Sequence, residues 1–253
     1  MTAAPTTITG SGNFLNFRSS AMVTSSSVYT RTFKPRTTDW DSKSAGRPFT
    51  VYKDPGVASA MLFSNMNGAN LEFNIANGEL VKMKMGAVGG AFTQVTPVVA
   101  GSISYPTDRA YTWAVTSVSL NGTASADVEQ LTIKLDEAVE ARHTLNLSKL
   151  PSQSKHTGSR TLSIEGTIKF NDQTEYQAFI SQSERPLIVW LRGETAIQSG
   201  YYDELGITVP AFRYTEFKPA AGGPGEMSVG FTGKGKYHAG SATLITITHR
   251  SNK

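Results

Sequence analysis

The chain has no cysteine among its 253 residues. A disulfide framework, a thiolate metal site and a cysteine nucleophile are therefore excluded. The four histidines, His143, His156, His238 and His249, are isolated along the chain and show no metal-ligand spacing. We therefore expect neither a metal nor another cofactor.

Long apolar runs are also missing. No run approaches the roughly 20 residues that a membrane-spanning helix needs. The N-terminal stretch Met-Thr-Ala-Ala-Pro-Thr-Thr lacks the basic and apolar regions of a secretory signal. We therefore expect the protein to remain in the cytoplasm of the cell that makes it, without direct membrane insertion.

Charge is sparse, with 17% charged residues and a net charge of +4. No concentrated basic run with interleaved aromatics is present, so we expect no sequence-specific nucleic-acid binding. The charges are nevertheless unevenly distributed. Residues 1–50 hold Arg18, Arg31, Lys34, Arg36, Lys43 and Arg47 against Asp39 and Asp41, while 127–140 holds Asp127, Glu129, Asp136, Glu137 and Glu140 against Lys134. These two segments are candidates for mutual attraction, within or between subunits.

Catalytic chemistry has little support. The acidic pairs Asp203–Glu204 and Asp136–Glu137 are adjacent in sequence, and adjacent residues on a strand point to opposite faces. No base is grouped with them, so we assign them to surface charge and expect no enzyme.

Two other features resemble binding sites only superficially. The segment Gly86–Ala91 is rich in glycine but lacks a phosphate-binding motif and a following helix pattern. Trp113 and Trp190 lie within apolar strand patterns, so we expect them in the core rather than as sugar-stacking platforms.

Alternating apolar residues dominate the second half of the chain. Strands are predicted at 161–170, at 187–191 with both faces covered, at 206–214 and at 227–237. Pro210 lacks an N–H group, so the strand at 206–214 is predicted to lie at an edge or to carry a bulge.

One helix is predicted at about 172–183. Asp172 and Glu175 have the spacing of a capping box, and Pro186 ends the segment. Tyr176, Phe179 and Ile180 form its predicted packing face over about three turns.

The first half predicts β-hairpins. Asn77-Gly78, with the sequence of a type I′ turn, joins a hairpin over 69–86, and Asn121-Gly122 marks a second tight hairpin. Other expectations are a long irregular connection over about 87–110, a short strand at Leu145 and Leu147, a polar loop over 151–159 and a closing strand at 242–248. The fold class is mainly β: two antiparallel sheets in a sandwich or barrel-like domain, with one short α-helix.

The domain prediction has two parts. Residues 1–50 form a polar arm that cannot build its own core and is ordered by neighbouring subunits. Residues 51–253 form a single domain.

Several segments resemble the major tail tube proteins of long-tailed, siphovirus-type bacteriophages. They are Asn77 to Gly90, the strand Ile164-Glu-Gly-Thr-Ile-Lys-Phe170, the helix Glu175-Tyr-Gln-Ala-Phe179, the stop Ser183-Glu-Arg-Pro186, the strand Val209-Pro-Ala-Phe-Arg-Tyr-Thr-Glu216 and the stretch Gly222-Gly-Pro-Gly-Glu-Met-Ser-Val-Gly-Phe-Thr-Gly-Lys234. Each segment alone is an ordinary β pattern, so the specificity comes from their order and spacing.

This resemblance implies a structural virion protein. Its subunits would form rings, six to a ring because the chain has one tube domain, and the rings would stack into a hollow tail that carries double-stranded DNA. The implied partners are a tape measure protein inside the tube, a tail terminator, and distal tail or baseplate proteins, with assembly in the host cytoplasm.

The resemblance also implies contacts between subunits through arms and long loops. The candidates are Phe14, Phe17, Arg31, Phe33, Arg36, Trp40, Phe92, Pro97, Gly223, Pro224 and Glu226. Two alternatives are a tube protein of a contractile tail or secretion apparatus, and a β-sandwich module that binds carbohydrate or a receptor. Such a module would expose aromatic residues on a sheet face and remain a small oligomer.

Overall fold

A computed structural model describes residues 6–9, 17–25, 28–35, 49–55, 59–98, 110–125, 127–145, 151, 153–171, 173–198, 200–218 and 227–251. These residues form seventeen strands, one α-helix and one short 3-10 helix. Their strand pairs are antiparallel. The prediction of a mainly β fold with one short helix is confirmed.

The elements have the following bounds. The first strands are β1 (Thr6–Thr9), β2 (Phe17–Ser25), β3 (Val28–Pro35), β4 (Phe49–Lys53), β5 (Ala60–Ala76), β6 (Lys82–Val88), β7 (Ala91–Val95), β8 (Thr116–Leu120) and β9 (Thr123–Ser125). They are followed by β10 (Val128–Asp136), β11 (Val139–Arg142), β12 (Gln153–His156), β13 (Thr161–Lys169), β14 (Arg185–Gln198), β15 (Tyr201–Lys218), β16 (Ser228–Gly235) and β17 (Thr246–Ser251). The helices are η2 (Trp113–Val115) and α1 (Thr174–Ile180).

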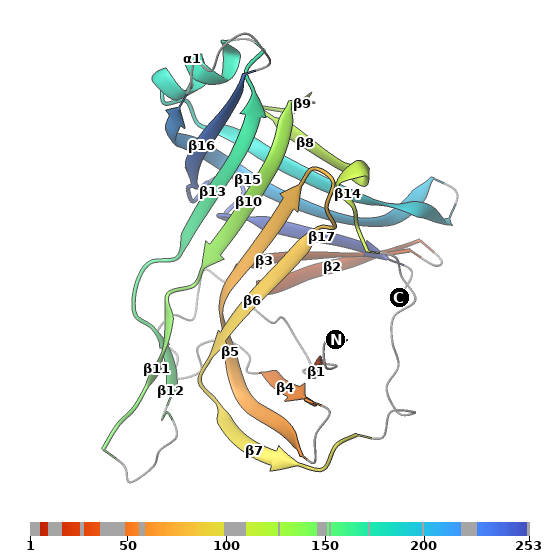
Figure 1. The fold of residues 1–253 in the computed structure, drawn as a ribbon, viewed down its shortest axis with the longest axis vertical. Coiled ribbons are helices and arrows are strands. Elements are labelled where there is room, and N and C mark those ends of the chain that lie inside the picture. Colours follow the sequence, from red (N-terminus) through yellow and green to blue (C-terminus); the bar gives the residue numbers. More distant parts are fainter. Residues whose placement is uncertain are drawn as a thin grey trace.

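Five neighbouring strands, β6, β5, β10, β13 and β16, form a front layer that runs diagonally in Figure 1. Alternation determines which face they bury: Phe73 of β5, Ile133 of β10 and Ile164 of β13 lie side by side in register, and all three are buried. The predicted hairpin over 69–86 and the strand at 161–170 are thereby confirmed.

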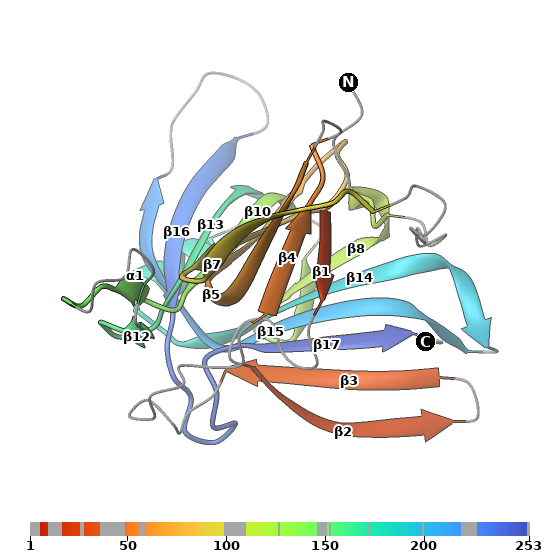
Figure 2. The ribbon, with the colours of Figure 1, turned by 90° about the horizontal axis from the view of Figure 1, so that it is seen from below.

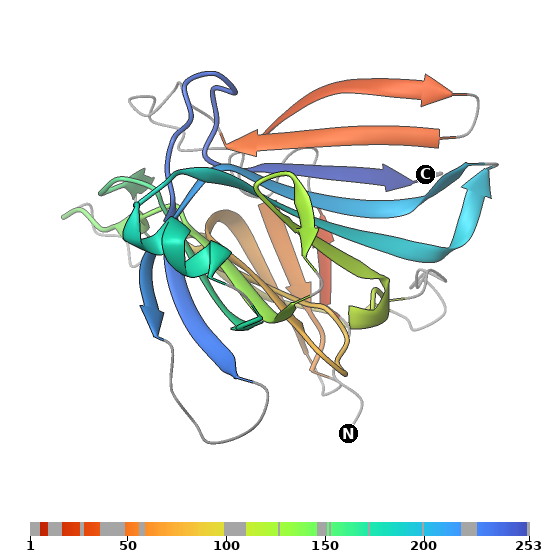
Figure 3. The ribbon, with the colours of Figure 1, turned by 90° about the horizontal axis from the view of Figure 1, so that it is seen from above.

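The strands β8, β14, β15, β17, β3 and β2 form a back layer that crosses the front one, as Figures 1 and 2 show. The β14–β15 hairpin is much longer than the two predicted strands at 187–191 and 206–214. Its far end projects beyond the layers (Figure 3).

Strand β15 belongs to both layers. Residues Glu204–Thr208 pair with β17, and Phe212–Lys218 pair with β16. Pro210 lies between these two ladders, where the register with β14 shifts so that β15 contains an extra residue. Because proline has no backbone N–H group, no hydrogen bond between strands is lost when it lies at a bulge. Of the two predicted alternatives for Pro210, the bulge is therefore confirmed.

The layers enclose one apolar core. Its largest fully buried side chains include Leu131, Ile133, Leu135, Leu162, Ile164, Leu187, Leu191, Ile207, Phe212, Tyr214 and Ile245. Burial of each such side chain contributes about 1.5–3 kcal/mol to folding. The hydrogen-bonded path through the described strands ends at β1 and β9, so the sheet is sandwich-like and is not closed into a barrel.

Helix α1 is shorter than predicted, with seven residues rather than about three turns. Its N-cap is Gln173, one residue after the predicted cap Asp172, which lies outside the described residues. Tyr176 and Phe179 pack against Phe217 of β15, as predicted for two members of the packing face. No helix in the described ranges is both long enough and apolar enough to cross a membrane.

An arm extends from the front layer. The first residues of β5, Ala60–Ser64, leave the layer and pair with β7, and β4 and β1 continue this small sheet, which lies in the lower part of Figure 1. We call β1, β4, β7 and Ala60–Ser64 the arm. The bend is at Gly89 and Gly90, whose φ values of 87° and 92° favour glycine.

The arm corrects the prediction of an irregular connection over 87–110. The glycines turn the chain without ending its pairing with β5, so Ala91–Val95 continue the hairpin as β7. Residues 99–109 lie outside the described residues.

A second projection consists of β11 paired with β12. It corrects the predicted polar loop over 151–159, because a polar segment forms a strand when a partner strand satisfies its backbone groups. Leu145, predicted in a strand, is fully exposed at a bend, and Leu147 lies outside the described residues. The predicted closing strand at 242–248 is shifted to Thr246–Ser251.

The two predicted tight turns differ. Asn121 and Gly122 both have positive φ, as a type I′ turn requires, and they join β8 to β9. At the first turn only Gly78 has positive φ, and Glu79 N donates to Ala76 O, so the type I′ prediction is wrong there. This pattern fits a type II turn, which needs positive φ at its second central residue alone.

Candidate functional site

The acidic residues considered for catalysis are held by basic side chains. Glu204 accepts a 2.6 Å hydrogen bond from Arg250 and lies 3.6 Å from Arg192. Asp203 lies 3.5 Å from His249. No group of three potential metal ligands occurs within the described residues. These contacts connect neighbouring strands.

Glu137 corrects the prediction of surface charge. Its side chain is fully buried, and Arg160 donates to Oε2 at 2.6 and 2.8 Å. Burial raises the pKa of Glu137, although Arg160 acts in the opposite direction. The second oxygen, Oε1, has no hydrogen-bond partner among the described residues. The pair lies where the front layer continues into β11, so it anchors the base of that projection.

A second polar cluster fixes helix α1 to the sheet. Arg185 lies 2.8 Å from both carboxylate oxygens of Glu175, and the Tyr214 hydroxyl donates to the same carboxylate at 2.6 Å. Burial and the nearby Glu175 carboxylate raise the pKa of Tyr214. These bonds orient the helix across the end of the sandwich.

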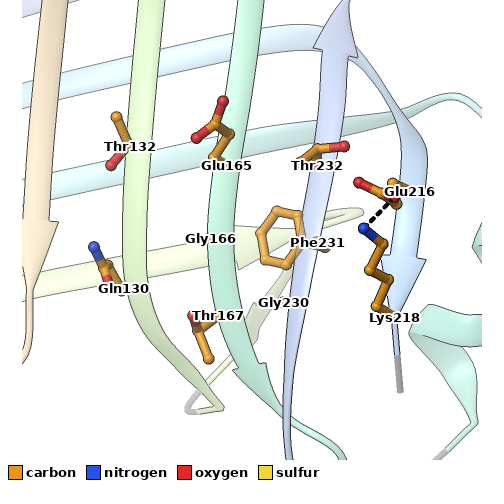
Figure 4. Close-up of a pocket in the computed structure, with 10 residues that line it drawn as sticks. All are labelled: Gln130, Thr132, Glu165, Gly166, Thr167, Glu216, Lys218, Gly230, Phe231 and Thr232. Atoms are coloured by element: carbon orange, nitrogen blue, oxygen red, sulfur yellow. Dashed lines mark ion pairs between the residues drawn. The ribbon is translucent and has the colours of Figure 1, made fainter. Parts of the chain in front are cut away.

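A shallow depression lies on the outer face of the front layer (Figure 4). It has a volume of about 330 Å³ and lies over β10, β13, β16 and the end of β15. Gly166 leaves space for the ring of Phe231, since a Cβ there would lie 2.7 Å from that ring. Its one ion pair, Lys218–Glu216 at 2.6 Å, is largely exposed. An open hollow of this kind does not enclose a small substrate.

The whole outer face of the front layer is polar. Cross-strand registers give two rows across six strands: Lys84, Glu72, Lys134, Ser163, Lys234 and Arg213 in one, and Lys82, Asn74, Thr132, Glu165, Thr232 and Glu216 in the other. This face therefore needs no apolar cover.

The arm differs from this face in exposing an aromatic side chain. Phe92 is 52% exposed, although its ring lies 5.5 Å from that of Phe63. The hydroxyl of Tyr52 accepts a 2.6 Å hydrogen bond from Val98 N, and Pro97 beside it is partly buried. Phe92 is thus a large apolar side chain that β7 leaves exposed to solvent.

The structure separates the predicted contact residues. On β3, Phe33 packs against the chain's own core and Arg31 is exposed. Phe17 of β2 lies opposite Pro35 of β3. The residues Phe14, Arg36, Trp40, Gly223, Pro224 and Glu226 lie outside the described residues.

Three side chains differ from the sequence predictions about packing. Ile180 ends helix α1 and is 54% exposed, while Ala178 is buried. Trp113 and Trp190 are 47% and 37% exposed, so their assignment to the core is wrong. Trp190 lies between two buried residues of β14 and therefore points away from the core, where Gly206 leaves space for its ring.

Open sheet edges, a polar sheet face and an aromatic arm together define a mainly β protein whose described surfaces fit assembly better than substrate binding. A family model described as phage tail tube protein matches residues 1–235, and the chain belongs to that family. It is thus a structural protein of the bacteriophage virion, a tail component whose family implies a tube built from multiple subunits. No curated protein matches the chain.

Proposed function

We propose that this protein forms hexameric rings that stack into the hollow tail tube of a siphovirus-type phage, through which DNA is delivered to the host. Family membership is the observation that carries this proposal. The open edges of the sheet support it, because unpaired strand edges are protected when neighbouring copies cover them around a closed ring. The role is structural, without enzymatic activity.

The arm supplies a contact between successive rings in this proposal. Phe92 is its exposed anchor, and Pro97 and residues 151–159 and 219–226 belong to further joints. Of the segment 1–50, we assign ordering by neighbouring subunits to the arm strand β1, because β3 and β2 pair within the chain's own back layer. The long reach of the arm beyond the front layer in Figure 1 supports a role that extends past one ring.

The remaining partners follow from the architecture of a tail. A tape measure protein occupies the tube, and a terminator and distal tail or baseplate proteins close its ends. Assembly takes place in the host cytoplasm, and passing double-stranded DNA makes no sequence-specific contact.

Electron microscopy of the concentrated, purified protein tests the proposal. Hollow tubes of uniform width with a regular axial repeat are expected, and end-on views should show sixfold symmetry. A sample that contains only monomers or small oligomers at every concentration would contradict self-assembly into a tube.

One observation favours a second function, a carbohydrate- or receptor-binding module. Trp190 is exposed on a sheet face, as such a module requires. Titration of tryptophan fluorescence with a panel of glycans distinguishes the two functions. Saturable quenching that is lost in Trp190→Ala, from a protein that remains a small oligomer, would favour the binding module.

A further inference from the structure

The bend between the front layer and the arm has a special backbone. Asn65 of β5 has a φ of 56°, and its carbonyl oxygen lies beside Gly89, whose φ is 87°. Among the described strands, two cross the bend: β5, and the chain that continues from β6 into β7. A ribbon of two strands has little stability of its own. The arm therefore needs a further contact if it is to keep one direction.

Strand β12 makes a contact at this bend. A Cβ atom at Gly89 would overlap the hydroxyl oxygen of Ser154 and would lie 3.7 Å from the Cβ of that serine. The partner strand of β12, β11, contacts both β5 and β6. Gly89 thus has two roles: it permits a positive φ, and it leaves space for a side chain from the β11–β12 projection.

The base of the same projection is fixed to the front layer. His156 Nδ1 lies 2.8 Å from the backbone oxygen of Glu137, and Thr157 N donates to Ala138 O at 2.9 Å. Glu137 N donates in turn to Ala69 O of β5 at 2.8 Å, and its buried side chain forms the ion pair described above. Strand β12 therefore connects a fixed point on the front layer with the bend of the arm.

We propose that the β11–β12 projection is a brace that sets the direction of the arm in the free chain, through the contact between Ser154 and Gly89. The inference rests on the proposed function, in which the arm contacts the next ring, and it names the element that orients this contact before assembly. A surface that is already oriented loses less conformational entropy on binding, so the brace should favour assembly at low protein concentration.

A disulfide between the two contact residues tests the brace. The natural chain has no cysteine, and a Cβ–Cβ distance of 3.7 Å suits a disulfide. The double variant Gly89→Cys/Ser154→Cys should therefore form an intramolecular disulfide in dilute, folded protein. The oxidised form should assemble at a concentration no higher than the reduced form, which carries the same two substitutions. Assembly of the reduced form alone would show that the arm must leave β12, and would overturn the proposal.

Gly78 supplies the matched control for disulfide formation. It also has a positive φ, of 78°, but no described atom beyond its chain neighbours lies within 4 Å of a Cβ built there. The variant Gly78→Cys/Ser154→Cys should form no intramolecular disulfide, as measured by mass spectrometry without reductant. Equal yields of disulfide in the two variants would overturn the contact between Ser154 and Gly89.

Spin labels measure the direction of the arm in the free chain. Labels at Thr93→Cys on β7 and Lys134→Cys on β10, both exposed positions, should give one narrow distance distribution by double electron–electron resonance. Adding Ser154→Leu should broaden or shift it, because Ser154 already fills the space beside Gly89. Adding Glu140→Leu, at an exposed position of β11, is the control and should leave it unchanged. A broad distribution with the natural Ser154 would overturn the brace.

The same variants separate this inference from the proposed function. Without labels, Ser154→Leu should raise the concentration needed for tube formation several-fold, whereas Glu140→Leu should not. A narrow distribution in a protein that forms no tubes at any concentration would support the brace and overturn the proposed function. Tubes from a protein with a broad distribution would overturn the brace and leave the proposed function intact.

Discussion

The sandwich and the arm both consist of antiparallel strands, but the side chains of these strands are buried to different extents. In the sandwich, side chains such as Phe212, Leu191 and Val189 are completely buried by the chain's own two layers. In the arm, the side chains of described burial that are fully enclosed are Phe49 and Ala60, and Phe92 remains half exposed. The comparison indicates that the sandwich buries its core within one chain, and it agrees with our proposal that the arm completes its packing against other subunits.

The largest effect is expected in the sandwich core. Phe212→Ala removes a fully buried ring that contacts Tyr214 at 4.7 Å between centroids. It should lower the free energy of unfolding by about 3–5 kcal/mol, since a cavity remains. Urea denaturation of the unassembled protein measures this loss. A loss below 1 kcal/mol would show that the core is not as tightly packed as described.

A comparable loss is expected at the base of the β11–β12 projection. Arg160→Met leaves the buried Glu137 carboxylate without its ion-pair partner, at a cost of about 3–5 kcal/mol near neutral pH. Urea midpoints measure the loss. The double variant Glu137→Gln/Arg160→Met is the control, because it removes the charge as well as its partner.

The same pair predicts a pH dependence. Burial raises the pKa of Glu137 above its ordinary value, so the folded chain takes up this proton at a higher pH than the unfolded chain. The contribution of Glu137 to stability therefore falls as the pH rises through the interval between the two pKa values. Arg160→Met widens this interval, and the variant should recover stability on acidification from pH 7.5 to about pH 5. If acidification instead lowered the stability of Arg160→Met as much as that of Glu137→Gln/Arg160→Met, the prediction would be wrong.

A smaller effect is expected where helix α1 joins the sheet. Tyr214→Phe removes one hydrogen bond to Glu175 but leaves the Arg185 contacts in place. The free energy of unfolding should fall by about 0.5–1.5 kcal/mol. Thermal melts compared with Tyr237→Phe, the same change at an exposed tyrosine, isolate the buried bond. Equal melting temperatures in the two variants would refute its contribution.

The smallest effect on the single chain is expected in the arm. Phe92→Ser should change the free energy of unfolding by less than about 0.5 kcal/mol, as for most exposed positions. It should nevertheless reduce the yield of tubes, measured by sedimentation of assembled protein. The matched control is Thr93→Ser, also exposed on β7. Normal tube formation by Phe92→Ser would remove the arm's proposed role.

The sequence predicts the sandwich better than the arm. Alternation over 161–170 predicts burial on one face, and the structure confirms it for Leu162, Ile164 and Ile168. A short, continuous apolar run does not show whether one face of a strand is covered or both. The run from Leu187 to Leu191 is of this kind, so the exposure of Trp190 was not predictable. In the sequence, the bend at Gly89 resembles the start of a loop, because glycine is common both at bends within a hairpin and at the starts of loops.

The candidate site was less predictable still. The burial of Glu137 depends on Arg160, 23 residues away, and no local pattern connects them. The open edges of β6 and β15 are also invisible in the sequence, because they depend on the order of strands in the sheet. Resemblance to tail tube proteins indicated the family, but not which strands face a neighbour.

The central claim is that the sandwich is complete in one chain, whereas the arm and the outer edge of β6 are covered only on assembly. Hydrogen–deuterium exchange, measured on unassembled and on assembled protein, tests this claim most directly. Amides of β14 and β10 should be protected in both states. Those of β7 and the outer edge of β6 should exchange rapidly in the free chain and slowly after assembly. Equal protection of β7 and β6 in both states, or new protection confined to β14 and β10, would contradict the account.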